Sequence, residues 1–284
     1  MHPPSVAAVQ VMKVTSQGSD NNNFISARSE DLLAVEEPLE ISILYGEENN
    51  RQTKNISVTM CTPGNEEELA TGFLFTEGLI KNREEVLQCR SLRDSGNSRI
   101  TVALKPGISF DPKKVERHFY TTSSCGVCGK SSIDAVKNNI VCQQESVALQ
   151  AEAAVITTLP DAVRKQQEVF KHTGGLHASA LFDLEGNLLM TREDVGRHNA
   201  LDKLIGASLM NGHIPLNKHI LLLSGRASFE LIQKAAMAGI KIVCAVGAPS
   251  SLAAELAKDC SMTLIGFLRD GRFNIYCGEQ RIKN

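Results

Sequence analysis

Two cysteines, Cys125 and Cys128, lie three positions apart within the polar, glycine-containing stretch Thr121–Lys130. A cysteine acts as a nucleophile in its thiolate form, and a nearby cation or a helix N-terminus lowers its pKa. Lys130 supplies a cation, and residues 131–136 are typical of a helix start, with serines before an early acidic residue. The spacing therefore predicts a reactive thiol pair.

Three other roles are possible for this pair: zinc ligation, thioredoxin-like redox chemistry and a structural disulfide. Half of a structural zinc site would need a second pair of Cys or His at ligand spacing, and the other six cysteines are scattered singly. A thioredoxin-like redox pair is expected early in a β-α-β pattern, whereas this pair lies in mid-chain. A structural disulfide between the two would stabilise little, because the closed loop is so short.

The composition restricts the class of protein. The length of 284 residues predicts two domains, because single domains are usually shorter. With 30 basic and 32 acidic residues, charge gives no reason to expect binding to nucleic acid or to a membrane. We find no secretion signal and no apolar run of about 18 residues, so a cytoplasmic protein is expected. The eight cysteines are then expected to be reduced thiols.

Changes in composition along the chain predict its organisation. Residues 1–30 are rich in Ser, Asn, Gln and Pro and are expected to form a flexible tail. A small α+β domain is expected at residues 31–118. Residues 119–145 then hold the cysteine pair and a short linking helix, and residues 146–284 form the larger α/β domain.

The small domain has clear local patterns. Residues 39–44 and 55–60 alternate apolar and polar side chains across a polar turn, which predicts an antiparallel hairpin. Three acidic residues begin a helix at Glu66, and Gly78 lies where its C-cap is expected. Residues 100–104 predict one more strand. None of these elements carries an obvious catalytic group.

The last third of the chain alternates apolar strands with helices. The expected strands are residues 219–223, 242–246 and 262–267, with helices at 229–238 and 251–259 between them. A helix at 160–172, a strand-turn-strand at 176–190 and a helix at 200–210 are expected before them. This order predicts a largely parallel sheet with helices on both faces.

Several polar loops are candidates for a binding site. Residues 224–226 and 247–250 each follow a strand and precede a helix, which is where ligands bind in open α/β sheets. Arg226 favours an anionic ligand for the first loop. The alternative is that the glycines and serines of these loops only form turns and cap the following helices. The segment Arg192–Asn199 is dense in charge around a glycine, which fits a functional site and a solvated helix start equally well.

Six blocks of sequence, in order, resemble the FdhD family, the formate dehydrogenase accessory sulfurtransferases. The blocks are NEEELATGFLFTEG from Asn65 to Gly78, then SCGVCG, TGGLHAS, EDVGRHNALDK, SGRASFE and FLRDGRFNIY. The resemblance covers roughly residues 31–282. It implies a cytoplasmic homodimer that has a cytidine-deaminase-like C-terminal domain and a smaller α+β N-terminal domain.

The resemblance also implies a function. Family members accept sulfane sulfur from a cysteine desulfurase as a cysteine persulfide. They pass it to the molybdenum bis(molybdopterin guanine dinucleotide) cofactor of formate dehydrogenase, which is the bound acceptor. On this pattern Cys125 carries the persulfide and Cys128 is its neighbour. The cofactor would be contacted by Phe267, Leu268, Arg269, Asp270, Gly271 and Arg272. The implied partners are the desulfurase and the catalytic subunit of formate dehydrogenase, with no metal site, nucleic acid or membrane.

The residues have chemistry that agrees with this expectation. A thiolate can take sulfur from a donor persulfide and release it to an acceptor, helped by a second thiol. Arg226, Arg269 and Arg272 could bind pyrophosphate, and Asp270 could accept two hydrogen bonds from a guanine edge, although R-D-G-R also suits a plain hairpin turn.

Two other functions are open. Zinc-dependent deamination fits poorly, because Ser179 stands where a glutamate is needed and no P-C-x-x-C follows. The other is a non-catalytic chaperone that binds the cofactor and the apo-dehydrogenase, with the cysteines as a clamp.

Overall fold

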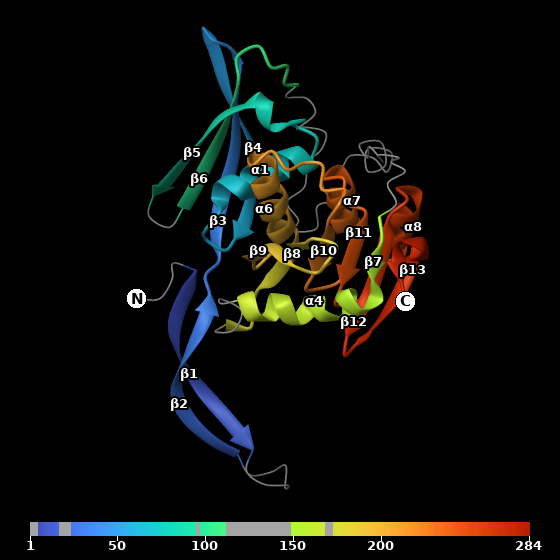
Figure 1. The fold of residues 1–284 in the computed structure, drawn as a ribbon. Coiled ribbons are helices and arrows are strands. Elements are labelled where there is room, and N and C mark those ends of the chain that lie inside the picture. The colour runs from blue at the N-terminus through green and yellow to red at the C-terminus, as the bar shows by residue number, and fades with distance from the viewer. Residues whose placement is uncertain (1–4, 17–23, 95–96, 112–148, 168–172) are drawn as a thin grey trace.

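The computed structural model describes residues 5–16, 24–94, 97–111, 149–167 and 173–284. Cys125, Cys128 and the expected linking helix lie outside these ranges. The described chain contains a projecting hairpin, a four-stranded sheet and a six-stranded sheet with helices around it, so the mixed α/β class is confirmed (Figure 1).

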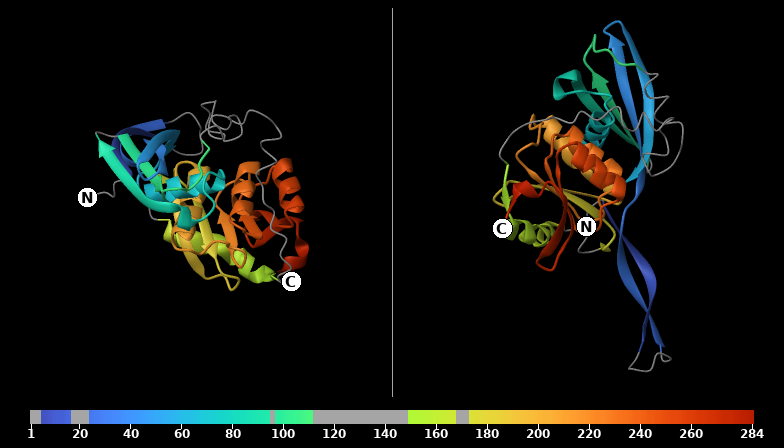
Figure 2. Two further views of the ribbon diagram at one scale, coloured as in Figure 1. Left: turned by 90° about the horizontal axis from the view of Figure 1, so that it is seen from above. Right: turned by 90° about the vertical axis from the view of Figure 1, so that its right-hand side faces the viewer.

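The N-terminal residues form a long antiparallel hairpin of β1 (Val6–Ser16) and β2 (Phe24–Ala34). It projects from the body of the protein (Figures 1 and 2). The expectation of a flexible tail at residues 1–30 is therefore wrong for the described part of that region. Four valines in residues 6–16 favour a strand, and the Ser- and Asn-rich composition is concentrated in residues 16–23 between the strands.

The second sheet has the strand order β4-β3-β6-β5. Its strands are β3 (Glu37–Glu47), β4 (Asn50–Cys61), β5 (Val86–Asp94) and β6 (Asn97–Leu104). The predicted hairpin and the predicted strand at 100–104 are confirmed, whereas β5 was not predicted. Helix α1 (Glu66–Thr76) begins after Asn65 and ends before Gly78, whose φ is 70°. The predicted helix is thus confirmed at both ends.

The six-stranded sheet has the order β13-β12-β11-β10-β8-β9. Its strands are β8 (His177–Phe182), β9 (Leu188–Asp194), β10 (Ile220–Leu223), β11 (Ile242–Ala245), β12 (Thr263–Arg269) and β13 (Arg272–Cys277). Only β10, β11 and β12 run parallel, so the expected largely parallel sheet is corrected to a mixed one. Short turns join β8 to β9 and β12 to β13, and a short turn can only join antiparallel neighbours.

Helices cover both faces of this sheet, as predicted (Figures 1 and 2). They are α4 (Ala153–Gln166), α6 (Arg197–Met210), α7 (Phe229–Met237) and α8 (Ser251–Asp259). Ile220 and Leu222 pack in the core under α4, and Leu221 and Leu223 pack in the core under the other three helices. Because successive side chains of a strand point to opposite faces of the sheet, the buried strand β10 contributes to two separate cores.

Two helix starts differ from the predictions. Helix α4 begins at Ala153 and holds Pro160 inside, buried, so the expected start at residue 160 is wrong. Proline is common in the first turn of a helix, which is why the helix was expected to start at Pro160. In the structure Pro160 lies inside the helix instead. Helix α6 begins at Arg197, three residues before the expected start. Two short strands, β7 (Ala151–Glu152) and β14 (Ile282–Lys283), pair with each other.

The four-stranded sheet and the larger layer share one hydrophobic core. Leu39 and Ile43 of β3 belong to the same buried cluster as Leu201 and Ile205 of α6. Helices α1 and α6 lie so close that a Cβ on Gly72 would overlap the backbone oxygen of Asp202. The expected division at residues 31–118 and 146–284 stays a prediction, but the described parts of these two segments are packed as one body.

Candidate functional site

The carboxyl ends of β10, β11 and β12 lie side by side, and the loops that follow them are hydrogen-bonded to each other. Gly247 N–H donates to Gly225 O at 2.9 Å, and Phe267 N–H donates to Gly247 O at 3.0 Å. Ala227 and Pro249 form a parallel bridge between the first two loops. The predicted loops 224–226 and 247–250 therefore meet at one sheet edge, where open α/β sheets bind ligands.

Phe267 is displaced outward at this edge by an irregularity in β12. The register between β12 and β13 shifts between Gly266 and Arg269, and Phe267 has a φ of 54°, which is unusual for a residue with a side chain. Phe267 is 37% exposed as a residue. An exposed aromatic ring held on a pinned backbone offers a flat apolar surface to a ligand.

The residues after Phe267 form the tip of the β12-β13 hairpin. Arg269, Asp270, Gly271 and Arg272 are all exposed there. Leu268 is fully buried in the core under α4. Five of the six predicted cofactor-contacting residues are thus available at the surface, whereas the Leu268 side chain has a packing role.

Two histidines approach the same edge from other elements. His177 is the first residue of β8, and its Nδ1 lies 3.2 Å from the position that a Cβ on Gly225 would take. His198 is in the first turn of α6, and its Nε2 lies 3.4 Å from Ser228 Oγ and 3.9 Å from Glu230 Oε2. Sequence reasoning did not bring these two residues together, because their proximity depends on how β8 and α6 pack.

Both histidines are neutral at physiological pH. Burial lowers the pKa of His198 to about 4, and the charges of Lys234 and Arg197 act in the same direction. Burial and the Arg197 charge also lower the pKa of His177. Arg197 Nε is buried and has no hydrogen-bond partner among the described residues. Helices α6, α7 and α8 begin at this edge, so their N-terminal dipoles add to the positive charges of Arg197 and of the exposed Arg226.

Most of the charged segment Arg192–Asn199 has a structural role. Arg192 Nη2 donates to Glu68 Oε1 at 2.8 Å, and Lys203 pairs with Asp194 at 2.7 Å. Asn199 Nδ2 donates to Met60 O at 2.8 Å. These contacts join β9 to α1, β9 to α6, and α6 to β4. Arg197 and His198 are then the members of the segment near the strand-end loops.

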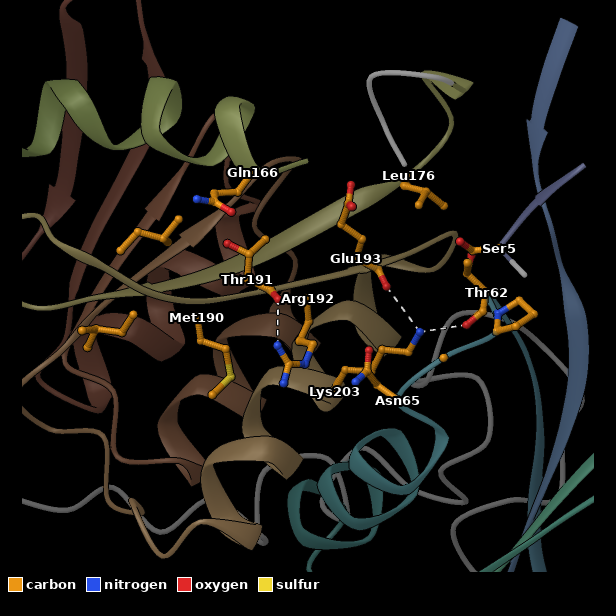
Figure 3. Close-up of a pocket in the computed structure, with 14 residues that line it drawn as sticks. Ser5, Thr62, Asn65, Gln166, Leu176, Met190, Thr191, Arg192, Glu193 and Lys203 are labelled. Carbon is orange, nitrogen blue, oxygen red and sulfur yellow. Dashed lines mark hydrogen bonds between the residues drawn. The ribbon is translucent and has the colours of Figure 1, made fainter. Parts of the chain in front are cut away.

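A separate pocket of about 490 Å³ lies along β9, at the other end of the sheet order (Figure 3). Lys203 Nζ lies at its wall and donates to Thr62 O and Glu193 O. Its other cation, Arg192, is paired with Glu68. Because the cationic groups of this pocket already have partners and none of the predicted cofactor-contacting residues lines it, we place the candidate site at the strand ends.

The described cysteines are poor nucleophiles. Burial raises the pKa of Cys61 to about 12 and that of Cys89 to about 11, and it also raises the pKa values of Cys244 and Cys277. These four are free thiols, as expected, whereas Cys260 is disulfide-bonded, which corrects that expectation at one position. A reactive thiolate is therefore not found among the described thiols.

No group of three or more His, Cys, Asp or Glu side chains that could hold a metal ion occurs among the described residues. In the same part of the chain, no helix is long and apolar enough to cross a membrane.

The fold and this edge define a mixed α/β protein with a candidate ligand-binding edge beside two half-buried neutral histidines. Residues 34–283 match the FdhD/NarQ family, and the chain belongs to it. The chain is 46% identical over 259 residues to the sulfur carrier protein FdhD of Streptomyces avermitilis, covering 89% of each chain. It is 46% identical over 261 residues to that of Mycobacterium tuberculosis, covering 89% of this chain and 92% of the other.

A solved structure has the same overall fold. It is the crystal structure of a putative formate dehydrogenase accessory protein from Desulfotalea psychrophila. The match has a TM-score of 0.70 with 24% sequence identity, and it covers 97% of this chain and 99% of that one.

Proposed function

We propose that this protein is a sulfur carrier that serves a formate dehydrogenase. It would take sulfane sulfur from a cysteine desulfurase as a persulfide on Cys125. It would then transfer the sulfur to a molybdenum bis(molybdopterin guanine dinucleotide) cofactor, which is its substrate. The observation that carries the proposal is family membership over residues 34–283, with relatives named as sulfur carriers, in a chain that has the Cys125–Cys128 pair.

In the proposed sulfur chemistry the two thiols act at different steps, with Cys125 as the carrier and Cys128 as a help in release. The Cys125 thiolate attacks the terminal sulfur of the donor persulfide, so the donor cysteine leaves as a thiolate and Cys125 becomes the persulfide. Attack by the Cys128 thiolate on Cys125 Sγ then releases the terminal sulfur as hydrosulfide for the acceptor. The products are hydrosulfide and a Cys125–Cys128 disulfide, and a dithiol reductant returns the pair to its starting state.

The strand-end loops have suitable groups for the nucleotide part of this substrate. The exposed Phe267 ring can stack on a base, and Asp270 can accept two hydrogen bonds from a guanine edge. Arg226, Arg269 and Arg272 are exposed and can bind phosphate oxygens. Arg197 lies beside the two neutral histidines, and its Nε has no partner among the described residues, so its guanidinium is available to an anionic group.

The finer fold and the assembly are part of the proposal. We propose that the six-stranded sheet and its helices are a cytidine-deaminase-like unit that lacks deaminase chemistry, because Ser179 occupies the position of the acid/base glutamate. The protein would act as a homodimer with two partners, the cysteine desulfurase and the catalytic subunit of formate dehydrogenase.

Mass spectrometry after incubation with a cysteine desulfurase and cysteine tests the proposal. The intact protein should gain the mass of one sulfur atom, and a thiol reductant should remove it. A protein that binds the cofactor but never gains sulfur would instead be a chaperone that uses the cysteines as a clamp.

A further inference from the structure

Tyr276, near the end of β13, is an exposed aromatic residue whose ring reaches the strand-end loops. Its Cε2 atom lies 3.0 Å from the position that a Cβ on Gly266 would take, and Pro249 Cδ lies 2.7 Å from the same position. The carbonyl oxygen of Gly247 lies 3.3 Å from it. The Tyr276 ring, the loop after β11 and the end of β12 therefore meet at one point of the candidate edge.

A β-bulge brings Tyr276 to this position. Leu264 and Ile265 are consecutive in β12, but their partners in β13 are Cys277 and Ile275, so Tyr276 is the extra residue between them. A bulge redirects a side chain, and bulges are common beside functional sites. The side chain of Tyr276 is therefore placed by the backbone of the strand pair and not by a mobile loop.

Phe267 and Tyr276 give this edge two exposed aromatic residues. Phe267 follows Gly266 directly and is displaced by a second irregularity of the same strand pair. The two residues are 37% and 42% exposed. Their rings are not in contact with each other, since the one ring pair within the described residues is Tyr45 with Phe110. Each of the two rings therefore has a face that a ligand can cover.

We propose that Tyr276 is a further substrate-binding residue, and that its ring stacks on the planar nucleobase of the substrate. The inference rests on the proposed function, which supplies the nucleotide. Every nucleobase has a π-face, so stacking on an aromatic ring adds affinity without selecting the base. Tyr276 thus contributes affinity, and the choice of guanine is left to Asp270.

The groups around the Tyr276 ring suit a base better than a phosphate. At Gly266 they are the Pro249 ring and the carbonyl oxygen of Gly247, which provide an apolar surface and a hydrogen-bond acceptor. A nucleobase has flat faces and amino donors at its rim, whereas a phosphate has acceptor oxygens. The exposed arginines of the edge are then left for the phosphates.

The protein's own fluorescence tests the stacking directly. The chain has three tyrosines, Tyr45, Tyr120 and Tyr276, and no tryptophan, so its emission comes from tyrosine. Guanosine diphosphate should quench part of this emission, and Tyr276→Phe should lose the quenching, because phenylalanine keeps the ring but hardly emits. By titration calorimetry this variant should bind within about threefold of the wild type, since it can still stack. Free tyrosine titrated in parallel corrects for light that the nucleotide absorbs.

Removal of the ring tests its contribution to affinity. Tyr276→Leu should weaken the binding of guanosine diphosphate and adenosine diphosphate by the same factor, about tenfold, because stacking does not depend on the base. The affinity for inorganic pyrophosphate, measured as a competitor, should not change, because pyrophosphate has no base. A residue that only maintained the shape of the edge would affect all three ligands.

Ile275→Ala is the matched control. Ile275 is 37% exposed on the same strand, but it pairs with Ile265, whose side chain lies in the core under α4. Because side chains alternate along β12, this pair faces away from the side on which Tyr276 covers Gly266. The control should bind both nucleotides like the wild type.

Three results would overturn the inference. They are nucleotide binding by calorimetry without quenching in the wild type, equal quenching in the wild type and Tyr276→Phe, and a loss of pyrophosphate affinity in Tyr276→Leu as large as the loss of nucleotide affinity. In each of them the wild type still binds nucleotide, so the proposed function stands. A wild type that binds no nucleotide would overturn the inference together with the nucleotide part of the proposed function.

Discussion

Lys234 and Asp202 form a buried ion pair, with Nζ 2.8 Å from Oδ2, where three helices meet. Thr76 Oγ1 of α1 donates to Asp202 Oδ1 at 2.8 Å, and Glu77 lies 3.6 Å from the Lys234 ammonium. Burial lowers the pKa of Lys234, but Asp202 and Glu77 outweigh it, so the net pKa is raised and the lysine is charged. The pair connects α1 to α6 and α7, on which the candidate site depends.

Removing one partner of this pair should be strongly destabilising. In Lys234→Met the side chain still fills the space, but Asp202 is left as an uncompensated buried charge, which costs about 3 to 5 kcal/mol. Urea denaturation should show this loss in the free energy of unfolding. Arg93→Met breaks the exposed pair with Glu37 and should cost less than about 1 kcal/mol. Similar losses of unfolding free energy in Lys234→Met and Arg93→Met would contradict the claim that burial makes the Lys234–Asp202 pair costly to break.

The close contact of α1 and α6 should not accept a side chain. Gly72→Ala places a methyl group onto the backbone of Asp202, so overpacking of about 1 to 3 kcal/mol should exceed the gain in helix propensity. Gly175→Ala is the matched control, because a Cβ there meets no atom closer than 3.8 Å. An unchanged or raised unfolding midpoint for Gly72→Ala would show that the two helices can separate at little cost.

His198 should make the protein less stable in acid. Its folded pKa of about 4 lies below the ordinary 6.5, so between these values the unfolded chain binds a proton that the folded protein excludes. The free energy of unfolding should therefore fall as the pH drops from about 6.5 to about 4, by up to about 3 kcal/mol from this group. Urea denaturation of His198→Gln should show a shallower pH dependence than the wild type. Parallel curves would place the acid sensitivity on other groups.

The nucleotide end of the substrate should bind to the strand-end loops. Guanosine diphosphate should bind more tightly than adenosine diphosphate, because Asp270 can accept from a guanine edge. Arg272→Ala should weaken binding by about 1.5 to 3 kcal/mol, the range for a charged hydrogen bond. Arg164→Ala removes the same charge from α4 and should leave the affinity unchanged. Titration calorimetry that gives equal affinities for both nucleotides would remove the β12-β13 tip from the site.

The sequence predicted the parallel centre of the sheet and the positions of the loops at its carboxyl edge well. The apolar runs of β10, β11 and β12 are separated by helices, and glycines follow the first two strands, so the positions of both loops could be inferred from local pattern. The displaced Phe267 also lies where its strand was expected to end. These features depend on residues that are close together in the sequence, so they could be predicted from local sequence patterns.

Features that depend on distant contacts were missed. The N-terminal hairpin was hidden because the polar residues 16–23 dominated the composition of the whole region. Arg197 and His198 were seen only as part of a charged segment, because the approach of His198 to Ser228 and Glu230 results from the packing of α6 on α7. The shared core of the two sheets likewise depends on contacts between α1 and α6, which are far apart in the sequence.

The central claim is that Cys125 carries sulfur to the acceptor, and Cys128 assists its release. Cysteine labelled with radioactive sulfur tests this claim. The label is followed from a desulfurase to this protein, and from this protein to the cofactor of an apo-dehydrogenase. The wild type should label the acceptor, Cys125→Ala should neither carry nor transfer label, and Cys128→Ala should carry label but release it slowly. Circular dichroism of the variants provides the control for folding. Acceptor labelling by Cys125→Ala at the wild-type rate would contradict the account.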